Sequence, residues 1–373
     1  MPALTRRSIL AAAATLPLAA QAETPGMIIR QKEPENLEFP FDSLNSFLTP
    51  NDRFYVRNHH PVPKLEAATW KLRVDGAVSK PLDLTYAELR ALPSVTIPAT
   101  LECAGNSRVF LVPQTPGAQW EMGAVSTAEW TGVPLSAILD LAGLNANALE
   151  VALEGADQGE GKNDPHPPGL IHFARSIPLE KARRPEVILA YRMNGKDLPL
   201  SHGFPVRALV PGYYGMASTK WLTRISVLTA PFNSYWQTSD YGYWDRSSGT
   251  PVRRPLLNMA IKSLIARPAM RETIKSGSEY KVFGSAWTGD ADIARVEVST
   301  DAGATWADAK LVDKAVRFCW RAWEYTWNAP SPGRHTLMSR ATDSSGNVQL
   351  AQHNPDFGNY VIHHTLPIEI EAA

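Results

Sequence analysis

The chain has 373 residues, of which 44% are hydrophobic and 20% charged, and its 37 Lys and Arg residues equal its 37 Asp and Glu residues. This composition is that of a globular protein, and the length is sufficient for two domains with separate cores. A formal net charge of zero excludes a broad basic surface for nucleic acid or anionic lipid. Any binding site for an anion must therefore be local.

Residues 1–22 have the pattern of an export signal. The stretch TRRSILAAAATLPLAAQAET joins Arg6 and Arg7 to a short Ala/Leu segment and a small-residue cleavage pattern at 20–22. We expect a twin-arginine signal, which is associated with cargo that folds around a cofactor before export. A general secretory signal with a chance arginine pair is the alternative. No segment approaches the roughly 20 apolar residues of a membrane span, so a soluble periplasmic protein is expected.

The chain contains only two cysteines, Cys103 and Cys319. They could form at most one disulfide, and neither belongs to a CxxC or CxxCH motif. We therefore expect no covalently attached haem and no cysteine-pair zinc site in this chain. If the protein moves electrons, a separate protein must accept them. Cys319, in a predicted strand before Trp320, is interpreted as a buried structural thiol.

Residues 27–250 combine short strands with a few helices. The stretch 69–92 predicts a strand, a polar turn and an amphipathic helix that begins near Thr85, with Glu88 completing a capping box. The stretch 125–144 repeats strand, turn and helix, and Gly143 marks the helix end. Because strands and helices do not alternate regularly, the pattern favours an α+β domain over a doubly wound sheet.

The pattern changes after the turn-rich stretch at 246–258, which is the predicted domain boundary. Residues 255–373 contain short alternating strands separated by Gly, Asp, Ser and Pro turns, as in KVFGSAWTG and VEVSTDAGATW. This pattern predicts an immunoglobulin-like β-sandwich.

Cys103 occupies the most informative position in the sequence. It follows a strand-like run and precedes Gly105 and Asn106, which allow a tight left-handed loop, while Arg108 supplies a positive charge that favours a thiolate. Such a thiolate is a metal ligand or a nucleophile, and an inert buried thiol is the alternative. With no second cysteine nearby, a metal here must bring most of its own ligands.

Other polar segments supply candidate partners for a ligand. In YVRNHHPVP, Arg57 and His59 alternate and should share one face, which either binds an anion or belongs to the surface. Asp157, in a polar loop at 154–169, could accept hydrogen bonds from a pterin-like N–H group. Tyr241 could face a pocket from an aromatic cluster that otherwise belongs to the core. Donors suited to a phosphate, or to a solvated loop, lie within 200–227: His202, Arg207, Ser218, Thr219 and Lys220.

Taken in order, these motifs resemble the sulfite oxidase family. The resemblance rests on YVRNHHPVP, LECAGNSR, GAVSTAEWTGVPL, EGAD, LAYRMNGKDLPLSHGFPVR, KWL, SYWQTSDY, AWTG, VEVSTDAGATW and CWRAWEYTW, which span nearly the whole chain after the signal. It implies a molybdopterin-binding α+β domain at 27–250, an immunoglobulin-like dimerisation domain at 255–373, and a homodimer. It also implies one molybdenum–molybdopterin cofactor in each chain.

The resemblance implies roles for individual residues. Cys103 would be the thiolate ligand of molybdenum, beside the sulfur atoms of one molybdopterin. Arg57 and Arg108 would form the cationic substrate pocket, and His59 and Tyr241 would line it. The residues implied to hold the pterin and its phosphate are Tyr55, Asn58, Asp157, His202, Arg207, Ser218, Thr219 and Lys220.

The implied reaction is the oxidation of sulfite to sulfate, with electrons passed singly to a separate c-type cytochrome. Alternatives are a related molybdenum enzyme for another oxyanion or sulfur species, such as a sulfane-sulfur dehydrogenase subunit, a methionine sulfoxide reductase, and a catalytically silent scaffold. One departure concerns the C-terminus. Family members commonly place an arginine in the pocket from a segment that here reads NPDFGNYVIHHTLPIEI. Either His363 or His364 substitutes for it, or the pocket carries less positive charge.

Overall fold

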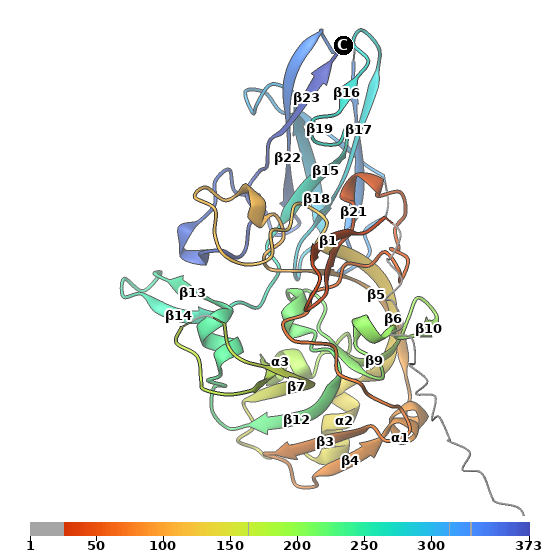
Figure 1. Ribbon diagram of the computed structural model, residues 1–373, viewed down its shortest axis with the longest axis vertical. Helices are drawn as coiled ribbons and strands as arrows, with labels where there is room; N and C mark the ends of the chain where they lie inside the picture. The colour runs from red at the N-terminus through yellow and green to blue at the C-terminus, as the bar shows by residue number, and fades with distance from the viewer. Residues whose placement is uncertain (1–25, 163, 313, 329) are drawn as a thin grey trace, which may run out of the picture.

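The computed structural model describes residues 26–373 with the exception of 163, 313 and 329. Its two domains follow one another along the long axis of the molecule (Figure 1). The predicted export signal at residues 1–22 lies outside the described residues. Within the described part of the chain, no helix is long and apolar enough to cross a membrane.

The N-terminal domain is built on two five-stranded sheets. The first has the order β10-β9-β6-β5, with β11 also paired to β9, and consists of β5 (Val95–Glu102), β6 (Val125–Pro134), β9 (Ile188–Met193), β10 (Lys196–Asp197) and β11 (Arg207–Leu209). The second has the order β4-β3-β12-β7-β8 and consists of β3 (Lys71–Gly76), β4 (Leu82–Thr85), β7 (Glu150–Gly159), β8 (Ile171–Pro178) and β12 (Leu222–Leu228). Only β3 and β12 pair in parallel within these sheets, so the α+β class is confirmed.

Two predicted helices form with the expected ends. In helix α1 (Tyr86–Ala91), the Thr85 hydroxyl accepts from the Glu88 backbone N–H and the Glu88 carboxylate accepts from the Thr85 N–H (2.8 Å), which completes the capping box. Helix α2 (Leu135–Ala142) ends at Gly143, whose φ is 67°. The polar turn predicted in the first stretch lies between β3 and β4, and the additional strand β4 separates it from α1. The turn predicted before α2 is wrong, because α2 follows directly on β6.

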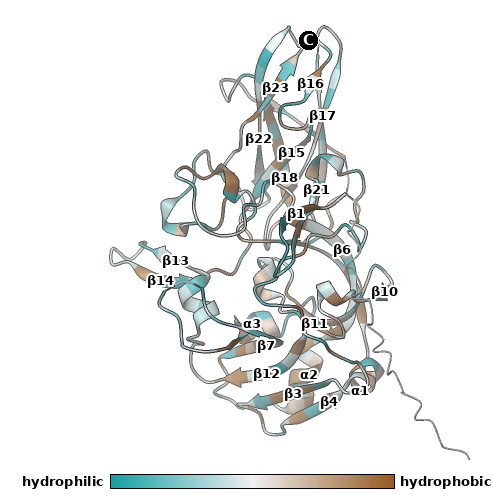
Figure 2. Cartoon of the chain, in the orientation of Figure 1, coloured by the Kyte–Doolittle hydropathy of each residue, from teal (hydrophilic) through white to brown (hydrophobic). Residues whose placement is uncertain are grey.

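The C-terminal domain is a sandwich of two sheets. One has the order β15-β17-β21-β20 and consists of β15 (Lys262–Arg267), β17 (Tyr280–Trp287), β20 (Lys310–Leu311) and β21 (Arg321–Trp327). The other has the order β16-β23-β22-β18-β19 and consists of β16 (Thr273–Ile274), β18 (Ile293–Ser299), β19 (Ala307–Asp308), β22 (Gly333–Asp343) and β23 (Ile368–Ala372). Both hydrophilic and hydrophobic residues occur along these strands (Figure 2), as expected where one face packs and the other is solvated.

Smaller elements lie around the two domains. The stretch 246–258, predicted as a connection, contains the turn and second strand of a hairpin that projects from the side of the molecule (Figure 1). A π-helical turn, Tyr235–Asp240, immediately precedes this hairpin. Further elements are α3 (Leu179–Ala182) and two hairpins, β1 (Ile28–Gln31) with β2 (Asn36–Glu38), and β13 (Gly242–Asp245) with β14 (Val252–Pro255).

The two domains share a continuous hydrophobic core. One cluster of buried side chains contains Ala104 and Val125 from the N-terminal domain together with Trp287 and Trp323 from the sandwich. Large aromatic side chains contribute much of the apolar area buried in such a core. The loop that follows β5, which carries Cys103, therefore lies at the junction of the domains.

Candidate active site

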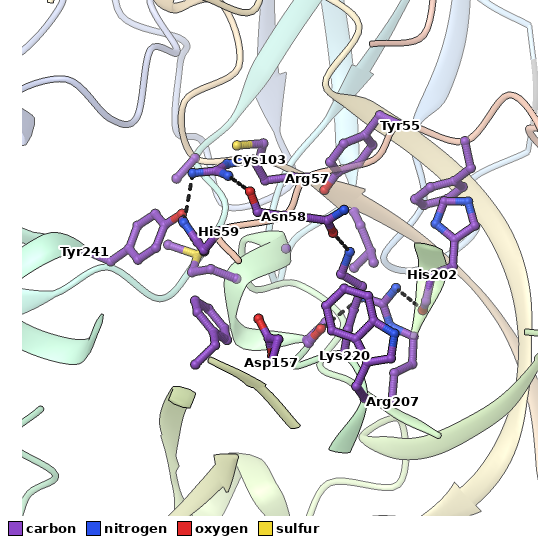
Figure 3. Close-up of a pocket in the computed structure, with 18 residues that line it drawn as sticks. Tyr55, Arg57, Asn58, His59, Cys103, Asp157, His202, Arg207, Lys220 and Tyr241 are labelled. Carbon is purple, nitrogen blue, oxygen red and sulfur yellow. Dashed lines mark hydrogen bonds between the residues drawn. The ribbon is translucent and has the colours of Figure 1, made fainter. Parts of the chain in front are cut away.

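A cavity in the N-terminal domain brings together most of the residues predicted for the site (Figure 3). Strands of both sheets contribute, because β5 and β11 belong to one sheet and β7 and β8 to the other. The residues that line it are Phe54, Tyr55, Arg57, Asn58, His59, Leu101, Cys103, Ala104, Asp157, Phe173, His202, Arg207, Gly215, Met216, Ser218, Lys220, Trp221 and Tyr241. Of the predicted site residues, only Arg108 and Thr219 do not line this cavity.

Cys103 lies where the chain leaves strand β5. Its backbone N–H donates to the Ala124 carbonyl (2.9 Å) and its carbonyl accepts from the Asn106 N–H (2.8 Å), so the thiol sits on a tight, hydrogen-bonded turn. The predicted left-handed residue at Gly105 or Asn106 is wrong, because the left-handed residue is Ser107, with φ of 76°. The thiol is free of any disulfide, buried, and at the cavity wall.

The guanidinium group of Arg108 lies in a groove that two glycines keep open. A Cβ atom at Gly105 or at Gly117 would overlap the guanidinium, so neither position has room for a side chain. Its Nε donates to the Asn359 carbonyl (3.0 Å) and one terminal nitrogen donates to the Ala118 carbonyl (2.7 Å). These contacts fix the guanidinium plane.

An outer cavity of about 360 Å³ adjoins the inner one. Residues common to both cavities are Arg57, His59, Cys103 and Tyr241. Arg108 lines the outer cavity alone, so the two predicted substrate arginines and the predicted metal ligand are all residues of the outer cavity.

Arg57, His59 and Tyr241 form a hydrogen-bonded chain across this junction (Figure 3). A terminal nitrogen of Arg57 lies 2.9 Å from His59 Nδ1, and His59 Nε2 lies 2.7 Å from the Tyr241 hydroxyl. The predicted shared face of Arg57 and His59 is therefore realised as a direct contact, although the segment is not a regular strand.

The protonation states of Arg57, His59 and Tyr241 fix the direction of each hydrogen bond between them. Burial, followed by the positive charge of Arg57, holds the pKa of His59 well below its usual value, so the imidazole is neutral. A guanidinium can only donate, so Nδ1 of His59 accepts and its Nε2–H donates to the Tyr241 oxygen. Burial raises the pKa of Tyr241. The phenol therefore keeps its proton, and that O–H remains available to a molecule in the cavity.

The opposite end of the inner cavity carries two cations, the buried Arg207 and the half-buried Lys220. Arg207 donates to the carbonyls of His202 (3.0 Å) and Ser218 (2.9 Å), and Lys220 Nζ donates to the Ser201 carbonyl (2.8 Å). Lys220 also donates to the Asn58 side-chain oxygen. Among the described residues, no carboxylate lies within ion-pair distance of either cation.

Burial dominates the electrostatics of this end. It lowers the pKa of Arg207 to about 10, and burial together with the neighbouring Arg207 lowers the pKa of Lys220 well below its usual value. It also raises the pKa of the nearby Asp157 to about 6. An anion bound at this end would offset the cost of burial and favour the charged forms of Arg207 and Lys220.

Two predicted residues differ from expectation in their surroundings. Asp157 was expected in a polar loop but lies within β7, beside an irregularity in its pairing with β8. Thr219 is buried, and its hydroxyl donates to the Leu153 carbonyl (3.4 Å) instead of facing the cavity. The geometry therefore does not support a cofactor contact for the Thr219 side chain.

Sequence reasoning missed an aromatic wall beside His59. The His59 ring stacks on Phe173 (5.1 Å between centroids) and lies 4.5 Å from the Trp236 ring. No motif identifies Phe173, which belongs to an ordinary strand pattern. These rings hold the imidazole in place and reduce its contact with water.

Arg175 is a second omission. It is fully buried, donates to the carbonyls of Gln237 (3.3 Å) and Leu256 (2.6 Å), and lies 5.6 Å from the Tyr241 ring centre. Burial lowers its pKa to about 10. A charged residue within a strand that also contains Phe173, Ala174 and Ile177 was the available signal.

The C-terminal segment reaches the site without an arginine. Neither His363 nor His364 lines either cavity, so neither substitutes for the missing arginine, whereas Asn359 and Tyr360 line the outer cavity. The Tyr360 ring lies 5.2 Å from the Arg108 guanidinium carbon. The pocket therefore obtains its positive charge from the N-terminal domain.

Cys319 lies outside both cavities. It occupies a turn and not the predicted strand, and it is partly exposed. Burial of its thiol raises the pKa to about 12, so the thiol is protonated and reacts slowly at neutral pH.

Comparison with known proteins defines the class of the fold and site. Residues 59–236 match the family model described as an oxidoreductase molybdopterin binding domain, and residues 253–356 match the one described as a Mo-co oxidoreductase dimerisation domain. The protein is thus built as a molybdopterin-binding oxidoreductase with a dimerisation domain.

Individual similar proteins identify the family within this class of oxidoreductases. Sulfite oxidase of Gallus gallus is 38% identical over 345 residues, covering 87% of this chain and 73% of the relative, and that of Arabidopsis thaliana is 31% identical, covering 87% and 88%. The crystal structure of sulfane dehydrogenase SoxCD from Paracoccus pantotrophus superposes with a TM-score of 0.79 at 28% identity, covering 89% of this chain and 83% of the other. The chain spans 61–62% of the length of mammalian mitochondrial relatives.

The chain belongs to the sulfite oxidase family. This confirms the resemblance and the two-domain fold class expected from the sequence.

Proposed function

We propose that this protein oxidises sulfite to sulfate at a molybdenum–molybdopterin centre and passes the electrons singly to a separate c-type cytochrome. The observation that carries the proposal is that Cys103, Arg57, Arg108 and Tyr241 all line the outer cavity, which adjoins the inner one. Its relatives named sulfite oxidase support the same substrate.

The cavity residues fit this cofactor on two grounds. In the described part of the chain, no group of three or more His, Cys, Asp or Glu side chains is arranged to hold a metal. A metal at Cys103 would therefore take its remaining ligands from a cofactor. At the far end, the buried Arg207 and the half-buried Lys220 have no carboxylate within ion-pair distance among the described residues, which suits an anionic phosphate. His202, Asn58 and Asp157 would contact the pterin between these ends.

The chain's own residues would bind and orient the substrate. When bound, the molybdenum cofactor supplies the oxygen-atom transfer and the two-electron redox change. Arg57 and Arg108 would hold the oxyanion and neutralise its charge. Because His59 donates to the Tyr241 oxygen, the Tyr241 O–H is directed to an oxygen of the bound anion. The aromatic wall limits water around the reacting groups.

The test is elemental analysis for molybdenum on the purified protein, combined with reduction of cytochrome c on addition of sulfite. About one molybdenum atom per chain with sulfite-dependent reduction supports the proposal. If the protein held molybdenum but did not oxidise sulfite, the cofactor site would stand and sulfite would not be the substrate.

A second candidate is a sulfane-sulfur dehydrogenase. The structural similarity to SoxCD over most of both chains favours it, as does a C-terminal segment that brings Tyr360 and no arginine to the outer cavity. Turnover with a sulfane-sulfur substrate but not with sulfite would decide for this reaction.

We also propose a homodimer formed through the C-terminal sandwich. The match of residues 253–356 to a dimerisation-domain model supports it. Sedimentation at micromolar concentration should give twice the mass of one chain. A monomer alone under these conditions would contradict the dimer.

The mature protein is proposed to act in the periplasm after export in folded form. The support is the Arg6 and Arg7 pair with the short apolar segment behind it. Replacing both arginines by lysine should leave the protein in the cytoplasmic fraction. Unchanged export of that variant would indicate the general secretory route.

A further inference from the structure

Strand β5 presents its two faces to different parts of the molecule. Leu101 and Cys103 line the inner cavity, whereas Thr100 and Glu102 contact the sandwich domain. This division follows from the alternation of side chains along a strand. The Thr100 hydroxyl accepts from the backbone N–H of Trp320 in the sandwich (2.8 Å). The residue directly before the predicted metal ligand therefore faces the other domain.

Glu102 is held by two side chains of the sandwich. Lys262 Nζ, from β15, donates to Glu102 Oε1 (3.0 Å), and Trp287 Nε1, from β17, donates to Glu102 Oε2 (2.8 Å). Lys262 also donates to the Asn106 carbonyl (3.2 Å), inside the Cys103 turn. The Asn106 side chain in turn donates to Glu102 Oε1 (3.1 Å).

This group is fully enclosed. The side chains of Lys262 and Glu102 are only 1% and 2% exposed. Removing one partner of such a pair leaves an uncompensated buried charge, which is far more costly than losing a surface pair. A stray carboxylate next to Cys103 would also repel a thiolate. The backbone of the turn receives one more bond from the second domain, from the Val361 N–H to the Ala104 carbonyl (2.7 Å).

We propose that Lys262, Glu102 and Trp287 act as a positioning group that fixes the Cys103 turn for metal binding. Through this group the sandwich domain sets the geometry of the site, in addition to any role in dimerisation. The inference rests on the proposed function to the extent that Cys103 is taken as the molybdenum ligand. Lys262, Glu102 and Trp287 do not line either cavity, so they act only through the turn.

The experiment uses the full-length Lys262→Met protein, purified from cells supplied with molybdate. Molybdenum per chain is measured, and alkylation of Cys103 and Cys319 by iodoacetamide is followed by peptide mass spectrometry. Loss of an outer-shell partner lowers metal affinity by about 10- to 100-fold. We therefore expect reduced molybdenum content and about tenfold faster alkylation of Cys103, with Cys319 unchanged. A merely structural role would increase the alkylation of both cysteines together.

Two further variants complete the test. Lys310→Met removes a surface pair with Glu324, since Lys310 is 76% exposed, and should leave both readouts unchanged. Glu102→Gln preserves the shape and should give a smaller effect in the same direction, even if Lys262→Met does not fold. Wild-type molybdenum content and a wild-type ratio of Cys103 to Cys319 alkylation in Glu102→Gln would overturn the inference. Wild-type protein that holds molybdenum without oxidising sulfite would refute the proposed substrate and leave this inference standing.

Discussion

The two ends of the inner cavity both carry arginine, but they hold it differently. At the deep end, the buried Arg207 and the half-buried Lys220 donate to backbone carbonyls and one amide oxygen. At the outer end, Arg57 is part of a chain through His59 and Tyr241 that opens into a second cavity. A permanently bound anion suits the first arrangement, and an exchangeable small anion suits the second.

This difference has an energetic consequence. Burial of the deep cations lowers their pKa values, so an anion that binds there stabilises the folded protein. Loss of the cofactor should therefore destabilise the deep end more than loss of substrate destabilises the outer end. Substitutions at the two ends should accordingly affect cofactor retention and substrate affinity separately.

The largest effect is expected at the point where the two ends meet. Cys103→Ser should lower sulfite turnover by at least about 100-fold, because the thiolate ligand of the metal is lost. The serine fits the same turn, so the protein should remain folded, as circular dichroism and a melting curve would show. Substantial residual sulfite oxidation would show that Cys103 is not the metal ligand. The assignment of one end of the cavity to the cofactor and the other to the substrate would then fail.

The next effect concerns the deep end alone. Lys220→Met removes a charged donor and should weaken cofactor binding by about 10- to 100-fold. Molybdenum per chain after extended dialysis measures this loss. The matched control is Lys80→Met. Lys80 is exposed and lines neither cavity, so this variant should retain full molybdenum. Equal retention in the two variants would contradict a phosphate site at Lys220.

A smaller and different effect is expected at the outer end. Arg57→Gln removes one charge-assisted contact to the oxyanion and should raise the Michaelis constant for sulfite about tenfold or more, with molybdenum content unchanged. Cys319→Ala, outside both cavities, should leave this constant unaltered. If both variants changed it equally, the substrate pocket would lie elsewhere.

Local features of the fold were predictable from the sequence. The capping box of Thr85 and Glu88 and the glycine end of α2 depend on neighbouring residues only, and both form as expected. The left-handed residue in the Cys103 turn was assigned to the wrong position, since several small residues there could adopt it and Ser107 does. Local propensity does not choose among them.

Long-range features of the site required the fold. The contact of His59 with Tyr241 joins residues 182 positions apart, and the resemblance alone placed them in one pocket. Phe173 carries no motif, and Arg175 gains meaning only through its contacts with the segment around Tyr241. Conversely, Thr219 stands among phosphate-type donors in the sequence but turns its hydroxyl to Leu153.

The smallest expected effect is on protein stability alone and involves neither end of the cavity. Burial, aided by nearby positive charges, lowers the pKa of His60 from 6.5 to about 4, and His60 lines neither cavity. Between these values the unfolded state binds more protons than the folded state. The free energy of unfolding is therefore highest above pH 6.5 and falls as the pH decreases toward 4, by about 1–2 kcal/mol at pH 5 from this residue.

His60→Phe should remove this part of the loss, because phenylalanine has a similar shape and does not titrate. It also eliminates Nε2, which has no hydrogen-bond partner among the described residues. Urea unfolding at pH 7 and pH 5 measures the difference, and His166→Phe, at an exposed position, serves as the control. Molybdenum content should stay at the wild-type level in both. If His60→Phe lost as much stability as wild type on acidification, His60 would be protonated in the folded protein. Burial would then not lower the pKa of His60.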